Sequence, residues 1–259
     1  MAINSPEEIV KDRVIAVQEY SLLAGEAVAN LFRRPRYLAD MLLQADFIGF
    51  GSLPIVGLTG LSIGGVLALQ TSSTLQQFGS VSLTGQLVSF SMIKEIGPVL
   101  TSLMLAGRAA TGMASELGSM KVTEQIDAMR ALGTDPVKKL VTPRVVSTVI
   151  MLFFLTILSD LMGLFGGFVV GVGRLGLSTR QYWTSTYQSL QFADVFQGLL
   201  KPFFFGFIIA TVGCYFGVST KGGTQGVGRS TTQAMVVSSV LILIVDFFLT
   251  QLLIWIFGR

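Results

Sequence analysis

No charged side chain occurs between Phe47 and Ile93. An ionised group near the centre of a bilayer costs about 2.5 to 3.5 kcal/mol on insertion scales, so a long stretch without charge is typical of a membrane protein. The composition agrees, because 13% of the residues are charged, against about 25% in a soluble globular protein. Intrinsic disorder is also excluded, since it requires low hydrophobicity and 51% of these residues are hydrophobic.

The positions of the charges predict an all-α integral membrane protein with five spans. We expect the spans at about residues 47–70, 97–117, 145–172, 202–218 and 234–257, near the length of about 20 residues that a bilayer requires. Arg108, Asp160 and Asp246 place charge well inside them. The uncharged stretch 70–91 fits an external helix, a re-entrant piece or an extension of the first two spans. Residues 47–259 thus form the membrane domain.

Residues 1–46 are predicted to form an amphipathic helix and its lead-in. Ser5, Pro6 and Glu8 have the arrangement of a capping box with Pro at the first helical position. The following apolar residues recur at helical spacing, so we expect the helix to lie on the membrane surface. A solvated helix packed on a soluble partner is the alternative. The helix is followed by the basic residues Arg33, Arg34 and Arg36.

The distribution of Lys and Arg predicts the orientation. With a cytoplasmic N-terminus, the inside segments hold twelve of these residues and the outside segments five. The five expected outside are Lys94, Arg174, Arg180, Lys201 and Arg259. The positive-inside rule favours this orientation, and five spans then place the C-terminus outside.

Glycines spaced four residues apart predict close helix packing. They occur on three expected spans, as Gly60 and Gly64, as Gly163, Gly167 and Gly171, and as Gly213 and Gly217.

The sequence argues against catalysis by this chain. It has no His and a single Cys, Cys214, which removes the usual general base, metal ligands and thiolate clusters. We predict no catalytic residues and no metal site. The run 223–230 resembles a phosphate-binding loop but has Arg229 where such a loop requires Lys. The small net charge of +3 also argues against nucleic-acid binding.

The loop between spans two and three is predicted to contain a short helix at about 123–132, with Gly133 at its C-cap. Asp135 and Pro136 then favour a second short helix that Pro143 ends. A rigid cytoplasmic helix of this kind suits docking to a motor subunit. An ordinary interfacial helix is the alternative.

Several motifs, taken in order along residues 45–255, resemble the MlaE (YrbE-like) permease family. They are Lys94–Val99, Ala106–Ala109, Glu116–Gly118, Val122–Met129, Asp135–Pro136, Pro143–Arg144, Gly226–Thr232 and Asp246–Phe247. The resemblance implies the inner-membrane permease subunit of an ABC transporter that moves phospholipids between the inner and outer membranes and maintains outer-membrane lipid asymmetry.

The resemblance also implies partners. Two copies of the chain would enclose a lipid cavity and bind cytoplasmic ABC ATPase subunits, a STAS-domain protein and a periplasmic hexamer of MCE-domain subunits. The ATPase would bind the ATP and Mg²⁺, so no cofactor is expected in this chain. The helix 123–132 would be the coupling helix, with contacts to the ATPase from Glu124, Asp127, Ala128, Met129 and Leu132.

Lipid contacts are expected near the outer ends of the first two spans. Lys94 would meet a lipid phosphate, and Glu95 would pair with Lys94 or with a headgroup amine; a snorkelling pair is the alternative. The candidates for contact with the tails are Leu67, Leu69, Leu75 and Phe78. Inside the bundle, we expect Arg108 and Asp246 to form an ion pair.

Two other classes of protein are alternatives to a transporter permease. An ion-coupled secondary transporter or channel would work without an ATPase and would need an ion relay, for which the three intramembrane charges give thin support. A membrane-embedded lipid enzyme is disfavoured by the absence of His and of a cluster of acidic residues within the spans.

Overall fold

The computed structural model describes residues 6–31, 33, 35 and 37–257, and throughout these residues the regular structure is helical. The predicted capping residue Ser5 lies outside this part. The α-helices are α1 (Pro6–Leu31), α2 (Leu38–Gly49), α3 (Leu53–Gln77), α4 (Thr84–Ser91), α5 (Gly97–Leu105), α6 (Thr111–Val122), α7 (Gln125–Ala131), α8 (Thr142–Gly173), α9 (Thr179–Ser189), α10 (Phe192–Val218) and α11 (Gly223–Phe257). Short 3₁₀ turns are η1 (Phe50–Ser52) and η2 (Val81–Leu83), and π turns are η3 (Met92–Ile96), η4 (Ala106–Ala110) and η5 (Val137–Val141).

Five helical segments are long and apolar enough to cross a membrane, which confirms the predicted all-α membrane fold. They are Leu38–Gln77, Val81–Val122, Val137–Gly173, Phe192–Val218 and Gly223–Phe257. The uncharged stretch 70–91 extends the first two spans, with a turn at residues 78–80. The expectation that Pro143 ends a helix is wrong. Pro143 lies in the first turn of α8, directly after the π turn η5, and the helical segment Val137–Gly173 continues through it.

Glycines allow the central helices to touch through their backbones, as the spacing predicts. The space where Gly64 of α3 lacks a side chain is filled by the backbone of Gly163 in α8. A Cβ atom on Gly60 would lie 2.6 Å from the Ser159 carbonyl oxygen. On the other side of the bundle, a Cβ on Gly213 of α10 would lie 3.0 Å from the backbone of Ala110. These contacts leave no room for larger side chains.

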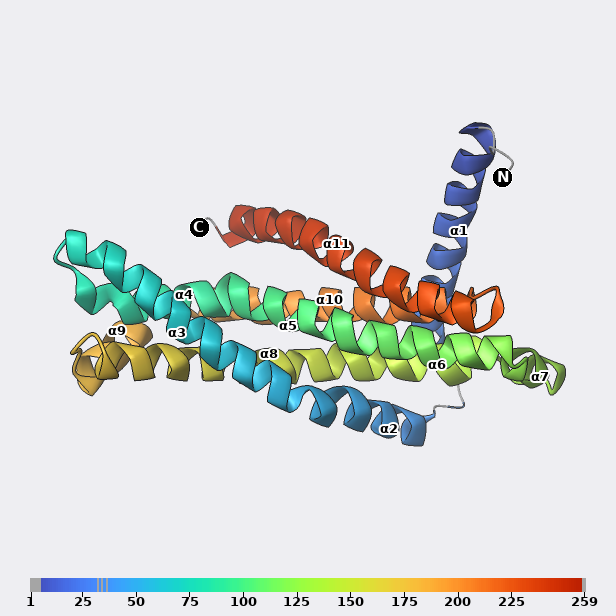
Figure 1. Ribbon diagram of the computed structural model, residues 1–259, viewed down its shortest axis with the longest axis horizontal. Helices are drawn as coiled ribbons and strands as arrows, with labels where there is room; N and C mark the ends of the chain where they lie inside the picture. The colour runs from blue at the N-terminus through green and yellow to red at the C-terminus, as the bar shows by residue number, and fades with distance from the viewer. Residues whose placement is uncertain (1–5, 32, 34, 36, 258–259) are drawn as a thin grey trace.

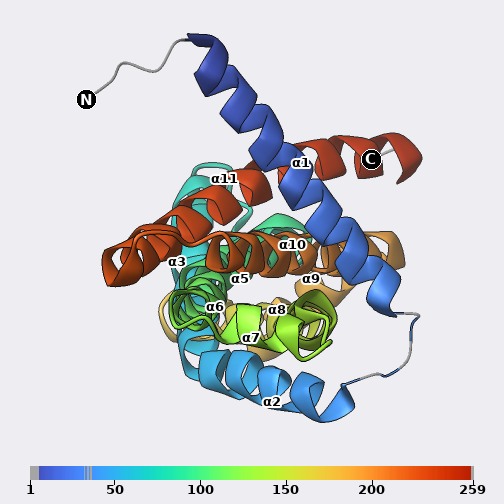
Figure 2. The ribbon, with the colours of Figure 1, turned by 90° about the vertical axis from the view of Figure 1, so that its right-hand side faces the viewer.

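The first and last helices diverge from this bundle. Figures 1 and 2 show α1 crossing one end of the bundle and α11 diverging towards its C-terminus. Val14 and Val17 of α1 are exposed, whereas the Tyr20 hydroxyl lies 2.9 Å from Thr211 Oγ1 in α10. Helix α11 is strongly apolar and yet mostly exposed. Both helices therefore present apolar surface away from the bundle.

Basic residues are more numerous at one end of the bundle than at the other. α7 and the α10–α11 turn lie at one end, and α9 and the α3–α4 turn at the other (Figure 1). The α7 end holds Lys121, Arg130, Lys138, Lys139, Arg144, Lys221 and Arg229, and the α9 end holds Arg174 and Arg180.

Two of the basic residues expected outside are in fact inside the bundle. Lys94 is 8% exposed and Lys201 is 1% exposed. The placement of Lys201 before the fourth span was wrong, because α10 begins at Phe192 and so contains it.

Candidate functional site

A cluster of charged side chains joins the second, fourth and fifth spans. At its centre lies the ammonium of Lys201, which pairs with the carboxylates of Glu95 and Asp246; Lys201 Nζ lies 2.8 Å from Asp246 Oδ1. Lys201 Nζ also donates a hydrogen bond of 2.8 Å to Thr250 Oγ1, which in turn donates to Glu95. Such extensive pairing is what a buried ammonium requires.

The charged cluster borders a pocket that is lined mainly by residues of α11. The side chain of Glu95 is 38% exposed and that of Asp246 is 19% exposed, whereas Lys201 lies behind them. The pocket has a volume of about 430 Å³, and it is lined by Glu95, Asp246, Phe247, Thr250, Gln251 and Ile254. It therefore offers carboxylate and hydroxyl oxygens next to an apolar wall.

The sequence suggested that Glu95 pairs with Lys94 or with a headgroup amine. In the structure Lys94 does not pair with Glu95. Its ammonium lies 3.3 Å from Asp194 Oδ1, and 4.6 Å from the centre of the Phe90 ring. Both side chains of the Lys94–Asp194 pair are buried, so Lys94 is not free to meet a lipid phosphate at the mouth of the pocket. Asp194 also accepts a hydrogen bond from the backbone N–H of Gln191, which helps to start α10.

The π turn η3 contains both Lys94 and Glu95 and is followed by Pro98 in the first turn of α5. Adjacent residues on a helix point in different directions, about 100° apart. Lys94 therefore reaches the first turn of α10, and Glu95 reaches Lys201 and α11.

Arg108 and Asp246 do not form the expected pair. Arg108 Nη1 donates hydrogen bonds to Ser52 Oγ at 2.6 Å and to the Phe47 carbonyl oxygen at 3.1 Å. Asp246 binds Lys201 instead. The expectation of an Arg108–Asp246 pair rests on their similar depth, and it is wrong because Lys201, expected outside, lies inside the bundle and binds Asp246. The signal that would have found it is Asp194, an acidic residue in the first turn of a helix that starts before Lys201.

The four residues expected to contact lipid tails lie on α3 and the turn after it. Leu67 packs against the buried cluster of Ala68, Val88 and Met92. Leu69 and Leu75 are half-buried, and Phe78 is exposed at the turn. They do not line the Glu95 pocket.

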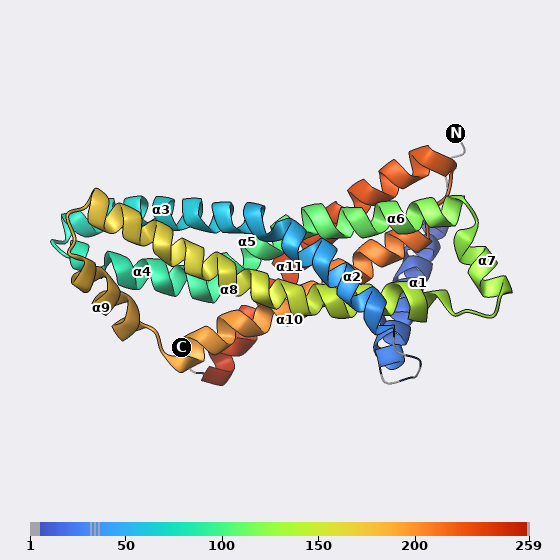
Figure 3. The same cartoon turned by 90° about the horizontal axis from the view of Figure 1, so that it is seen from below.

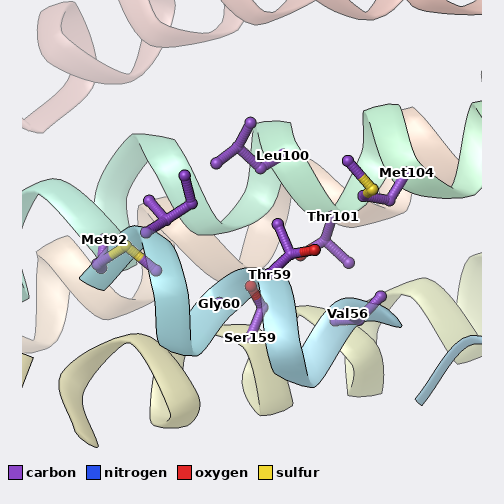
Figure 4. A pocket seen from close by; sticks show the side chains of 9 residues that line it. Val56, Thr59, Gly60, Met92, Leu100, Thr101, Met104 and Ser159 are labelled. Carbon is purple, nitrogen blue, oxygen red and sulfur yellow. The ribbon is translucent and has the colours of Figure 1, made fainter. Parts of the chain in front are cut away.

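Asp160 and a small cavity lie deeper in the bundle. Asp160 is 6% exposed and packs against Gly97, and its Oδ1 atom has no hydrogen-bond partner among the residues that the structure describes. The cavity lies between α3, α5 and α8 (Figure 4), and the side chains of Thr59, Thr101 and Ser159 line it. Its volume of about 10 Å³ suits at most one water molecule. It is too small for a lipid.

The predicted coupling helix is α7, which is anchored by buried Ile126 and otherwise mostly exposed. Glu124 precedes it with a φ of 60°, in the left-handed region. The exposed residues Gln125, Ala128 and Leu132 give α7 a mixed polar and apolar surface, and Met129 is half-buried.

Asp127 of α7 lies close to two basic side chains. Its carboxylate lies 2.8 Å from Lys121 Nζ and 3.8 Å from Arg130. The hydrogen bond from Lys121, together with the positive charge of both neighbours, lowers the pKa of Asp127 below its ordinary value of 3.8.

Comparison with known proteins identifies the family. The model of the Permease MlaE family matches residues 41–252. The chain belongs to the MlaE permease family. It is 44% identical over 237 residues to a probable ABC transporter permease protein of Rickettsia conorii, with 92% of each chain covered. It is 34% identical to the intermembrane phospholipid transport system permease protein MlaE of Haemophilus influenzae, with 82% of each chain covered.

A plant relative is also similar to this MlaE-family permease. It is the chloroplastic protein trigalactosyldiacylglycerol 1 of Arabidopsis thaliana, 34% identical over 89% of this chain and 66% of the plant protein. The family match includes the charged cluster and α7 but leaves out α1. Two of the motifs that suggested the family meet in the fold, because Arg144 Nη2 lies 2.7 Å from Glu116 Oε2.

Proposed function

We propose that this ABC transporter permease moves phospholipids between the inner and outer membranes and so maintains outer-membrane lipid asymmetry. The name of the Haemophilus relative supports this substrate. The observation that carries the proposal is the pocket beside Glu95, Asp246 and Thr250, where polar oxygens adjoin the apolar side chains of Phe247 and Ile254. A phospholipid presents the same combination of a polar headgroup and apolar tails.

The lipid is proposed to bind with its headgroup at Glu95 and its tails along apolar side chains. The carboxylate of Glu95 accepts hydrogen bonds from a headgroup, and Lys201 holds that carboxylate in place. Lys94 supports the site from behind through its pair with Asp194. Beyond the pocket, the tails are proposed to pass along Leu67, Leu69, Leu75 and Phe78 of α3 and the turn after it.

A second copy of the chain is proposed to close this pocket. Helix α11 supplies five of the six residues that line the pocket, and the same helix is apolar and mostly exposed. Pairing two copies through this side would cover the apolar surface and enclose the lipid between them.

The chain is proposed to lie in the inner membrane with a cytoplasmic N-terminus and a periplasmic C-terminus. The excess of basic residues at the α7 end supports this orientation. In it, α7 reaches an ABC ATPase through Glu124, Asp127, Ala128, Met129 and Leu132, and a STAS-domain protein completes the cytoplasmic side. A hexamer of MCE-domain subunits receives lipid at the α9 end. ATP and Mg²⁺ bind to the ATPase, and this chain has no catalytic site of its own.

Purification from native membranes tests the coupling. We expect a tagged chain to retain an ABC ATPase, and we expect Leu132→Asp to release it because a charge replaces the most exposed apolar side chain next to α7. Leu83→Asp is the control, since Leu83 is 43% exposed in the turn η2 at the opposite end of the bundle. An isolated chain that transports in vesicles under an ion gradient, without an ATPase, would support a secondary transporter instead.

A further inference from the structure

The first span is interrupted near its middle. α2 ends at Gly49, the 3₁₀ turn η1 follows, and α3 begins at Leu53. Figure 3 shows that α2 and α3 run in different directions. α2 is thus a separate segment at the α7 end of the bundle, attached to the rest of the span by a turn.

Arg108 binds the break between α2 and α3. Its Nη1 atom reaches the carbonyl oxygens of Phe47 and Ile48 and the hydroxyl of Ser52. These carbonyl groups lie at the C-terminal end of α2, where a positive charge is favourable. Gly51 makes the contact possible, since a Cβ atom there would collide with the guanidinium group.

The other end of α2 is bound to the segment that follows α7. Asp40 pairs with Lys139 of the π turn η5, and the Lys139 ammonium lies 4.3 Å from the centre of the Tyr37 ring. Ser147 Oγ donates a hydrogen bond of 2.6 Å to the Met41 carbonyl oxygen. Only the short connection 132–136 separates η5 from α7. The Asp40–Lys139 pair therefore links α2 to the segment that directly follows α7.

The two basic residues that hold α2 both belong to π turns. Lys139 lies in η5 and Arg108 lies in η4, and the third π turn, η3, contains Glu95. π turns are often found at functional sites, where they interrupt the regular hydrogen bonding of a helix. η4 and η3 lie on the same span, separated by α5. Arg108 therefore connects α2 to the span that carries the lipid site.

Space beside α2 allows it to shift. A cavity of about 230 Å³ lies between α2, η5, α6 and the start of α8, and its lining includes Asp40, Glu116, Lys139 and Arg144. The cavity is bordered by the Asp40–Lys139 and Glu116–Arg144 ion pairs. A fully packed interface would instead hold α2 in one position.

We propose that α2 passes the movement of α7 to the lipid pocket, with Lys139 and Arg108 as positioning residues at its two ends. The inference rests on the proposed function, in which α7 docks on an ATPase. Movement of α7 shifts η5 and, through Asp40, α2. Arg108 then shifts the second span, and so changes the position of Glu95 relative to Lys201.

The test uses the complete complex with its ATPase in phospholipid vesicles and measures lipid transferred per ATP hydrolysed. Asp40→Lys and Lys139→Asp each place like charges together and should lower this ratio about tenfold, which corresponds to about 1.4 kcal/mol. Combining both substitutions should restore the ratio. Lys139→Arg keeps the pair and should have little effect. Lys221→Asp is the matched control, since Lys221 is exposed in the α10–α11 turn at the same end.

A second measurement shows whether Arg108 passes movement to the pocket or only stabilises the fold. An environment-sensitive fluorophore at Ile254→Cys reports on the pocket, and Cys214 is fully buried and does not compete for the label. ATP should change the fluorescence in the parent complex. Arg108→Gln should abolish the change while leaving ATPase binding intact, and Arg108→Lys should restore part of it.

The outcomes distinguish a failure of the proposed function from a failure of the proposed role of α2 as a relay. A parent complex without ATP-dependent lipid transfer overturns the proposed function and the relay together. A working parent whose Asp40, Lys139 and Arg108 variants keep both the transfer ratio and the fluorescence change overturns the relay alone. Loss in both single exchanges without restoration in the double exchange also overturns it.

Discussion

Lys201 and Glu95 form an ion pair in which the ammonium is buried and the carboxylate is partly exposed to a pocket. The two residues come from the fourth and second spans, so the pair joins the rim of the pocket to the core of the bundle. The group offered to a ligand is thus an acceptor held in place by a hidden cation. The sequence had instead suggested an exposed Lys94 that binds a lipid phosphate.

Lys201→Met should destabilise the protein strongly. It leaves the carboxylates of Glu95 and Asp246 close together without their cation, and breaking a buried pair in this way typically costs about 3–5 kcal/mol. Thermal unfolding in detergent measures the effect. Lys221→Met, at an exposed turn, should unfold at the parent temperature. Equal stability of the Lys201 and Lys221 variants would show that the cluster is not a structural ion pair.

Gly64→Ala should loosen the packing of α3 on α8, since the added methyl group meets the backbone of Gly163. Overpacking of this kind costs about 1–3 kcal/mol. Gly228→Ala is the matched control because no atom lies within 4 Å of its Cβ position. It should be neutral or stabilising by up to about 1 kcal/mol, as Ala favours a helix over Gly. Unfolding temperatures in the reverse order would contradict this packing.

ATPase binding should not depend on the protonation of Asp127 between about pH 5 and about pH 8. Since the folded pKa lies below the ordinary 3.8, the ion pair with Lys121 contributes above that value and is lost only as the pH falls through the lowered pKa. Co-purification across this range tests it. A midpoint near neutral pH that disappears in Asp127→Asn would contradict the lowered pKa.

Glu116→Gln should lower the free energy of unfolding less than Arg144→Met does, although the two residues form one ion pair. Arg144 is buried and also donates to the Leu140 carbonyl oxygen, so its loss leaves an unpaired acceptor, whereas Glu116 is about half exposed. A difference of about 1–3 kcal/mol in unfolding free energy is expected. Denaturant titration of both variants measures it, and an equal loss would argue that the pair is fully buried in the assembled complex.

The number of spans was predictable because charged groups are excluded from the bilayer, and residues such as Arg174 and Lys221 mark the boundaries. The glycine contacts were predictable because Gly60 and Gly64 repeat at helical spacing. Ion-pair partners were not. Lys94 and Arg108 each lie in a π turn, for which the sequence offers no simple signal. The partner of each is set by which helices meet, and a hydropathy pattern does not contain that information.

The boundaries of the helices were a second source of error. With the fourth span starting at about residue 202, Lys201 is expected outside the membrane and away from Asp246. The helix begins at Phe192, with Asp194 in its first turn, and this one correction accounts for the missed cluster.

Lipid movement by the reconstituted complex tests the central claim most directly. The parent chain, assembled with its ATPase in vesicles, should move a fluorescent phospholipid only while ATP is hydrolysed. Glu95→Gln should assemble with the ATPase but lose most of this transfer, because it replaces the exposed carboxylate with a neutral amide of the same shape that can still accept from Lys201. Transfer at the parent rate by Glu95→Gln, or transfer that continues without ATP, would contradict the account.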